Sequence, residues 1–281
     1  MRIMNLLVSN KDGGAETFFM RFGAAMYKRG IDQLMVMSPH SSRQQYLTDH
    51  ATPHVCIDFD RAGGLWGLWR LHQEIKKYQP HIIVAWLKRS PRLLPRHSNA
   101  IKVGRVGGYY KGKNYSNCDY VVANSIPLQD FMQEQGYKDA LCISNFIEEG
   151  PRRANCSPRR RPLLFFHGRL HPQKGLDILI HALQHIDADA QIVGAGPLEA
   201  QLRQRALLSG VAHRIDFLGW QKNAWSYLSQ ADVYVFPSRY EGTSNSLLEA
   251  MACGKPIITT NAASVSWFLT HEKNALIVDA D

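Results

Sequence analysis

Short apolar runs alternate with longer amphipathic stretches along the first half of the chain. Ile3–Val8 is an almost continuous apolar run, which is typical of a strand buried in a parallel sheet. Across Glu16–Arg29 the apolar positions recur at helical spacing, and Gly30 ends this stretch. The same reasoning predicts strands at Gln33–Met37, His81–Trp86 and Tyr120–Ala123, and helices at Leu65–Tyr78 and Pro127–Gln135. Alternating strands and helices predict a parallel, doubly wound sheet.

The alternation breaks at residues 148–162, where proline, glycine and arginine occur without periodicity, and then resumes. Further strands are predicted at Leu163–His167, Ala190–Val193, Ile215–Leu218, Val233–Pro237 and Pro256–Thr259, and helices at Leu176–His185 and Pro197–Leu208. We therefore expect an α/β protein with two Rossmann-like, doubly wound domains facing a cleft. The N-terminal domain spans residues 1–150, a linker spans 151–162, and the C-terminal domain spans 163–281.

The net charge of +9 over 281 residues lies mostly in the first 150 residues. A basic surface suits nucleic acid, an anionic membrane or phosphorylated substrates, and it can equally be a solvated face without a partner. No recognised nucleic-acid module occurs, so nucleic acid is not expected as a partner.

The five cysteines are scattered and form no C-x-x-C pair, which argues against a zinc cluster and favours a reducing compartment. The N-terminus lacks the pattern of a signal peptide, and no apolar run approaches the length of a membrane span. We expect a cytoplasmic protein, with peripheral contact to the inner face of a membrane as an added hypothesis.

Two glycine turns each join a predicted strand to a helix. Gly13 and Gly14 follow the first strand, where glycine lets the backbone approach a ligand and a helix N-terminus favours an anion. Gly194 and Gly196 partly match a dinucleotide fingerprint, but Glu199 stands where its third glycine would be. We interpret this second turn as structural.

Two cations follow the strand that ends at His167. Arg169 and Lys174 lie in the loop before the next helix, at the carboxyl end of a strand, where open α/β sheets bind ligands. Arginine offers a planar fork to phosphate and lysine a point charge, so the two side chains suit a diphosphate. The alternative is a pair of solvated loop cations.

A longer polar segment follows the strand that ends near Pro237. It places Glu241 in a loop and Glu249 about one turn inside a helix, for which Ser244 or Asn245 is the predicted N-cap. Backbone N–H groups at such a helix end favour anions, and carboxylates accept hydrogen bonds from sugar or ribose hydroxyls.

The spacing Glu241-x7-Glu249 resembles the motif of family 4 retaining glycosyltransferases. The segments Gly168-Arg169-Leu170-x3-Lys174-Gly175, Val193-Gly194-x-Gly196-Pro197-Leu198 and Gly13-Gly14 follow in the family's order, so the resemblance covers nearly the whole chain. It implies a GT-B fold and a retaining transferase that moves a hexosyl or N-acetylhexosaminyl group from a nucleoside diphosphate sugar to a glycan or glycolipid. Lipopolysaccharide, capsule or a related polysaccharide is the implied product.

The resemblance also implies the site residues. Arg169, Lys174 and Glu241 would be catalytic, with Arg169 and Lys174 on the diphosphate and Glu241 on the transferred sugar, while Glu249 would contact the ribose. The implied donor-binding residues are Gly13, Gly14, Arg169, Lys174, Gly242, Thr243, Ser244, Asn245 and Glu249. No metal or further cofactor is implied.

The sequence departs from the family pattern in three places. Members usually continue past the position of Asp281, so we expect an incomplete C-terminal domain. Residues 261–267 read Asn-Ala-Ala-Ser-Val-Ser-Trp where the family usually has a Gly-Gly pair and then a glutamate. Arg105-Val106-Gly107-Gly108-Tyr109-Tyr110 replaces a segment that often carries a histidine, and it resembles bacterial envelope-polysaccharide transferases.

Arg105 and Tyr109 are accordingly the expected acceptor-side residues. Aromatic and basic groups are enriched in the same half of the chain, at Trp66, Trp69, Lys88, Arg89, Arg92 and Arg96. They suggest docking to anionic lipid or to a phosphorylated glycolipid, although the tryptophans fit a core equally well. The alternative functions are a truncated, inactive nucleotide-sugar-binding module, a GT-B epimerase or phosphorylase, and a nicotinamide oxidoreductase.

Overall fold

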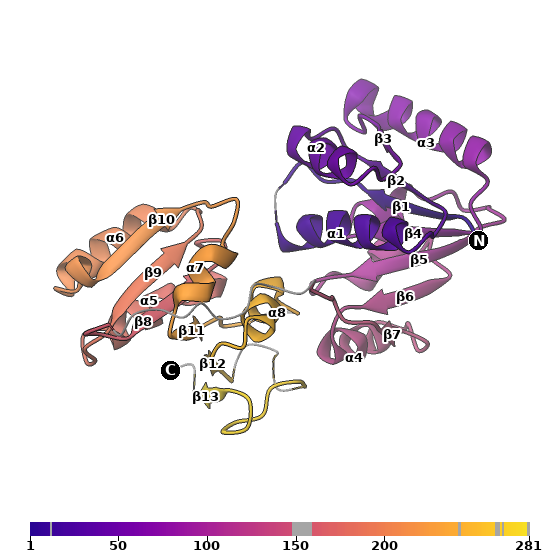
Figure 1. Ribbon diagram of the computed structural model, residues 1–281. Coiled ribbons are helices and arrows are strands. Elements are labelled where there is room, and N and C mark those ends of the chain that lie inside the picture. The colour runs from indigo at the N-terminus through magenta and orange to yellow at the C-terminus, as the bar shows by residue number, and fades with distance from the viewer. Residues whose placement is uncertain (12, 148–158, 241–242, 262–264, 266, 280–281) are drawn as a thin grey trace. The chain divides into compact units, whose positions relative to one another are not determined.

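The computed structural model describes residues 1–11, 13–147, 159–240, 243–261, 265 and 267–279. The chain divides into two units, Met1–Ser144 and Asn145–Asp281. Each unit is built on one sheet of parallel strands with helices packed against it (Figure 1). Most of the predicted linker 151–162 lies outside the described residues.

The first unit contains a seven-stranded sheet in the order β3-β2-β1-β4-β5-β6-β7. Its strands are β1 (Ile3–Leu7), β2 (Gln33–Met37), β3 (His54–Cys56), β4 (Ile82–Trp86), β5 (Ile101–Val106), β6 (Tyr120–Ala123) and β7 (Leu141–Cys142). Its helices are α1 (Gly14–Lys28), α2 (Ser41–Asp49), α3 (Leu65–Tyr78) and α4 (Ile126–Glu134), with 3₁₀ turns η1 (Arg61–Gly64), η2 (Ser90–Leu93) and η3 (Gly112–Tyr115).

Strand β1 lies inside this sheet, between β2 and β4, and every one of its residues is buried. It pairs in parallel with β2 and β4, and Ile3 is in register with Gln33 and Ile82. Helix α1 turns Phe18 and Phe19 toward the sheet, where both rings pack within 6 Å of Trp86, at 5.8 and 5.5 Å between centroids. Such burial of aromatic side chains is a main source of core stability.

The second unit contains a six-stranded sheet in the order β10-β9-β8-β11-β12-β13. Its strands are β8 (Leu163–His167), β9 (Asp189–Val193), β10 (Ile215–Gly219), β11 (Val233–Phe236), β12 (Ile257–Thr260) and β13 (Leu276–Val278). Its helices are α5 (Leu176–Ala182), α6 (Glu199–Leu208), α7 (Trp225–Gln230) and α8 (Asn245–Ala252), with 3₁₀ turns η4 (Pro172–Lys174) and η5 (Ala212–Arg214).

In both sheets the strand order reverses next to the first strand of the unit. The reversal lies between β1 and β4 in the first unit and between β8 and β11 in the second. Open α/β sheets bind ligands beyond the carboxyl ends of the strands at such a switch point. The topology therefore predicts ligand-binding sites in the loops that follow these four strands.

The predicted α/β class with two parallel doubly wound sheets is confirmed. Several elements have the predicted bounds, namely Gln33–Met37, Leu65–Tyr78, Tyr120–Ala123 and Leu163–His167. Among the helices of the described residues, none combines the length and the apolar character that a bilayer crossing requires.

Candidate functional site

The loop after β8 carries Arg169 and rests on the glycine turn that follows β9. The backbone N–H groups of Gly168 and Leu170 each donate to a carbonyl at the end of β9 or in that turn, at 3.0 Å. A Cβ on Gly194 would lie 1.9 Å from the Gly168 oxygen, and one on Gly196 would lie 2.3 Å from the Leu170 oxygen. Both glycines thus permit a close backbone approach, which agrees with the structural interpretation of this turn. Arg169 itself is exposed and makes no hydrogen bond or ion pair with a described residue.

Lys174 ends η4 and lies over the carboxyl end of the neighbouring strand β11. Its Nζ is 5.3 Å from the centroid of the Phe236 ring, a cation–π arrangement. The next residue, Gly175, has a φ of +60°, and a Cβ there would lie 1.9 Å from the carbonyl oxygen of Pro237. The loops after β8 and β11 are therefore packed directly against each other.

An arginine clamp joins the same two loops. Both terminal nitrogens of Arg239 donate to the Asp177 carboxylate, at 2.9 and 2.7 Å, and one of them also donates to the Pro172 carbonyl at 2.9 Å. The backbone N–H of Arg239 donates to the Gln173 carbonyl at 2.8 Å, and the Gln173 amide donates to the Tyr240 carbonyl at 2.8 Å. These bonds from Arg239, together with its charge, hold the pKa of Asp177 below its ordinary value.

Glu249 of α8 is buried against His167, the last residue of β8. Each residue is 7% exposed, and Glu249 Oε2 lies 2.7 Å from His167 Nε2. The other ring nitrogen of His167, Nδ1, is buried and has no hydrogen-bond partner among the described residues. Glu249, on the helix that follows β11, is therefore held by a side chain of β8, at the switch point between these two strands.

Helix α8 begins after Ser244, whose extended backbone makes it the N-cap. Its side chain bonds the Ser246 hydroxyl at 2.9 Å instead of a backbone N–H of the helix. Thr243 is buried, and the Asn245 amide oxygen accepts from the Asn145 side chain at 2.8 Å. The remaining predicted donor residues of this segment, Glu241 and Gly242, lie outside the described residues.

In the first unit the predicted glycine pair marks the start of α1. Gly13 is the N-cap and Gly14 the first helical residue. The Glu16 carboxylate accepts from the Ser9 hydroxyl at 2.7 Å, and a Cβ on Gly13 would lie 2.8 Å from the other Glu16 oxygen. Arg43, which is fully buried, donates to the Ser9 carbonyl at 2.7 Å. This turn is consequently fixed by side chains, and Glu16 already complements the helix dipole.

The structure places Arg105 inside the first unit. It is 8% exposed, and its guanidinium donates to the carbonyls of Ala123 at 3.2 Å and Ile143 at 2.6 Å. The rings of Phe18 and Trp86 lie 5.9 and 6.0 Å from the guanidinium carbon. Burial lowers the pKa of Arg105 to about 10, which leaves the side chain charged at neutral pH.

The aromatic residues expected at the surface of this unit divide into two groups. Tyr109 is 46% exposed and its ring meets Phe131 edge-on at 5.2 Å. Trp69 is 56% exposed, whereas Trp66 packs against the core. Tyr109 and Trp69 are thus accessible to a ligand or surface, and Trp66 has the core role that the sequence left open.

Comparison with known proteins identifies the family. A family model described as "Glycosyl transferases group 1" matches residues 161–281. The lipopolysaccharide core biosynthesis glycosyltransferase LpsD of Rhizobium meliloti is 32% identical over 289 residues, covering 99% of this chain and 84% of LpsD. The chain belongs to the group 1 glycosyltransferases.

Two further comparisons agree with this assignment. The lipopolysaccharide core biosynthesis glycosyltransferase LpsE of the same organism is 29% identical, over 96% of this glycosyltransferase and 82% of LpsE. The crystal structure of Anabaena Alr3699/HepE in complex with UDP-glucose superposes with a TM-score of 0.84 at 21% identity, covering 99% of this chain and 85% of that one. The GT-B fold implied by the sequence is confirmed.

Sequence reasoning missed two contacts at the candidate site of this glycosyltransferase. His167 ends an otherwise apolar strand, and a polar residue at that position was the available signal. Arg239 and Asp177 are separated by 62 residues, so nothing local predicts their pairing. Both contacts fix the positions of residues that the motifs had indicated.

Proposed function

We propose that this glycosyltransferase transfers a hexosyl or N-acetylhexosaminyl group from a nucleoside diphosphate sugar to a glycan or glycolipid acceptor, with retention of anomeric configuration. The nucleotide sugar is the substrate, and neither a metal nor a further cofactor takes part. Residues 163–281 form the donor side, residues 1–150 the acceptor side, and residues 151–162 link them. The enzyme works in the cytoplasm, on acceptors at the inner face of the membrane.

One observation carries the proposal: at the switch point between β8 and β11, the loop after β8 packs against the end of β11, with Lys174 over the Phe236 ring and the buried Glu249 carboxylate held by His167. Arg169 and Lys174 follow β8, and Glu249 lies one turn into the helix. In the proposed site Arg169 and Lys174 bind the diphosphate and stabilise the negative charge that develops as the sugar leaves. With the N–H groups of the helix end, they supply the positive charge that a metal ion supplies in other transferases.

The remaining residues have proposed roles by the same resemblance. Glu249 accepts hydrogen bonds from the ribose hydroxyls, and Glu241 contacts the transferred sugar. The names of the two rhizobial relatives and the UDP-glucose bound to HepE support a UDP-sugar donor and a lipopolysaccharide core acceptor. Arg105 acts on the acceptor side by holding the carboxyl ends of β5 and β6 together, and Tyr109 contacts the acceptor.

The direct test is calorimetric titration with UDP and with GDP. We expect Arg169→Ala and Lys174→Ala each to weaken binding of the preferred nucleotide about 10- to 150-fold, because a charge-assisted hydrogen bond contributes about 1.5–3 kcal/mol. Arg160→Ala is the matched control, since Arg160 is exposed at the opposite end of β8. Unchanged nucleotide affinity in both site variants would contradict the assignment.

A turnover assay distinguishes the reaction types. A transferase releases UDP from UDP-sugar at a rate that rises when a lipopolysaccharide core acceptor is added. An epimerase converts the donor alone, a phosphorylase requires phosphate, and an inactive binding module binds UDP without releasing it from the sugar.

A further inference from the structure

A basic cavity of about 510 Å³ lies at the carboxyl ends of β4 and β5 in the first unit. The loop after β4 contributes Lys88, Arg89 and Arg92, and the loop after β5 contributes Tyr109, Tyr110, Lys111 and Asn114. Four of these seven lining residues are cations and none is a carboxylate. The volume lies within the range of small-molecule sites, about 300–1,000 Å³.

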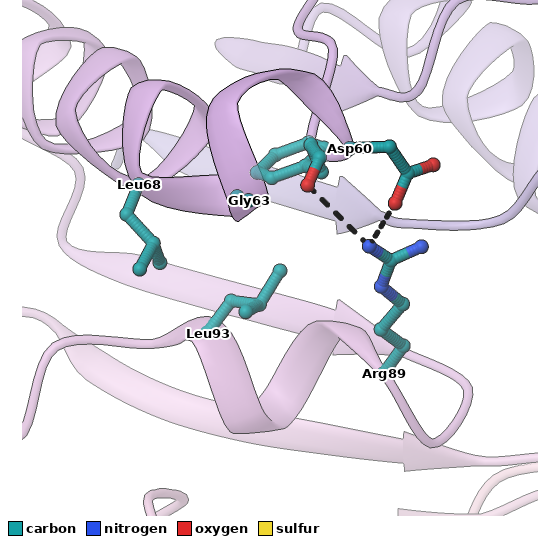
Figure 2. A pocket seen from close by; sticks show the side chains of 7 residues that line it. Asp60, Gly63, Leu68, Arg89 and Leu93 are labelled. Carbon is teal, nitrogen blue, oxygen red and sulfur yellow. Dashed lines mark hydrogen bonds and ion pairs between the residues drawn. The ribbon is translucent and has the colours of Figure 1, made fainter.

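Arg89 belongs to the wall between this cavity and a smaller neighbouring one. Figure 2 shows its guanidinium directed at the Asp60 carboxylate. Arg89 Nη2 donates to that carboxylate at 2.5 Å and to the Phe59 carbonyl at 3.4 Å. The hydrogen bond from Arg89 is the main reason that the pKa of Asp60 lies below its ordinary value. The charge of Arg89 is therefore already balanced within the protein.

The other three cations are available to a ligand. The side chains of Lys88, Arg92 and Lys111 are exposed, and none forms an ion pair or hydrogen bond with a described residue. Three like charges around one cavity repel one another, and an anion in the cavity removes that repulsion. Arginine and lysine together provide both the forked and the point-charge mode of phosphate binding.

The cavity walls are held in place by the fold. Leu87 precedes the first cation with a φ of +64°, a conformation that costs a non-glycine residue about 1–3 kcal/mol. The second wall is anchored at Gly112, whose carbonyl accepts from the Tyr137 hydroxyl at 2.9 Å and where a Cβ would lie 2.9 Å from Gln135 Cβ. The Asn117 amide ties the walls together by donating to the Leu94 carbonyl at 3.2 Å.

The aromatic residues of the lining restrict the class of possible ligands further. Tyr109 and Tyr110 line the cavity beside the cations, and the 46% exposed Tyr109 presents an apolar surface with a polar tip. A bare phosphate ion uses only the cations, whereas a phosphorylated sugar also uses the rings. Because the same loops belong to the acceptor side of the proposed function, we propose that this cavity binds a phosphate-bearing sugar of the acceptor glycan.

The test uses the full chain and a triple variant, Lys88→Gln, Arg92→Gln and Lys111→Gln. The probe is a deacylated lipopolysaccharide core oligosaccharide, titrated before and after enzymatic or chemical removal of its phosphates. We expect the triple variant to lose at least tenfold in affinity for the phosphorylated form, and we expect the dephosphorylated form to bind both proteins equally weakly. A matched triple variant, Lys77→Gln, Lys113→Gln and Lys138→Gln, removes the same charge at exposed positions outside the cavity and should change the affinity less than twofold.

Three results would overturn the proposal. Equal losses in both triple variants would show a general charge effect, and competition by inorganic phosphate as strong as by the oligosaccharide would show a phosphate site alone. Loss of binding to phosphatidylglycerol vesicles with unchanged oligosaccharide binding would show a lipid-docking surface. Titration with UDP separates this inference from the function on which it rests, since UDP affinity should be the same in all three proteins.

Discussion

Replacement of Glu249 by glutamine should weaken donor binding by a predictable amount. One oxygen of the Glu249 carboxylate lies 2.7 Å from His167 Nε2 in a buried site. Glutamine keeps the shape and exchanges charge-assisted hydrogen bonds, about 1.5–3 kcal/mol each, for neutral ones of about 0.5–1.5 kcal/mol. The difference for one ribose hydroxyl is about 1–1.5 kcal/mol, which corresponds to a 5- to 12-fold higher Kd for UDP.

Glu249→Ala should have a larger effect on both binding and stability. It removes the proposed ribose contact altogether, which predicts a loss of about 10- to 150-fold in UDP affinity. It also leaves His167 Nε2 buried without its partner, which lowers the free energy of unfolding by about 1–3 kcal/mol. Glu199→Gln is the control, because Glu199 begins α6 and forms an exposed pair with Arg203 instead of contacting the proposed site.

The assay that isolates the ribose contact compares UDP with 2′,3′-dideoxy-UDP in the wild type and in Glu249→Gln. The missing hydroxyls should cost the wild type more affinity than the variant, because the variant has already lost the charged acceptor. The excess measures the coupling between carboxylate and ribose, as in a double-mutant cycle. If the dideoxy nucleotide loses the same factor in both proteins, Glu249 does not contact the ribose and the reasoning fails.

Three further predictions concern the fold of the two units. Asp177→Asn should lower stability to urea at pH 7. Because the pKa of Asp177 is lowered in the folded state, the difference from wild type should shrink as the pH falls below about 4, and a difference that does not change with falling pH would contradict this. Gly194→Ala should lower Tm by at least about 4 °C, since the new Cβ would lie 1.9 Å from the Gly168 oxygen at a φ of +139°; an unchanged melting curve would show that the turn relaxes freely. Burial, with a smaller contribution from a neighbouring aspartate, raises the pKa of Cys118 to about 12. Thiol labelling at pH 8 followed by mass spectrometry should therefore find Cys118 slower than Cys56, and equal labelling rates would contradict this.

Sequence periodicity predicted the elements in which apolar residues determine the pattern. The strand Leu163–His167 and the helix Leu65–Tyr78 have the predicted bounds because the former is a continuous apolar run and the latter has an apolar stripe. Strand β5 was not predicted, since Lys102 and Arg105 interrupt its apolar run although both are buried. Helix α2 was missed for a related reason, as it buries one arginine and one leucine and is otherwise polar.

The candidate site was predictable only where the chemistry is local in sequence. The sequence indicates Arg169 and Lys174 as candidates because a strand ends just before them, and it indicates the helix of Glu249 because a cap precedes it. The contact between His167 and Glu249 spans 82 residues, so it depends on the order of strands in the sheet. No property of either residue alone indicates that β8 and β11 are neighbours. For Arg105 the local motif was misleading. The motif indicated a residue that faces the acceptor, but the side chain lies inside the unit.

The internal contacts also decide which cation is available to a donor diphosphate. Arg239 lies in the loop after β11, and by position alone it competes with Arg169 for that role. Its guanidinium is already engaged by both oxygens of Asp177 and by a backbone carbonyl, so a diphosphate would have to break a forked, charge-assisted pair to recruit it. Arg169 faces no such competition from the described residues, because it is exposed and makes no bond with them. The clamp therefore assigns Arg239 to holding the loops together, which agrees with the proposal that Arg169 and Lys174 bind the diphosphate.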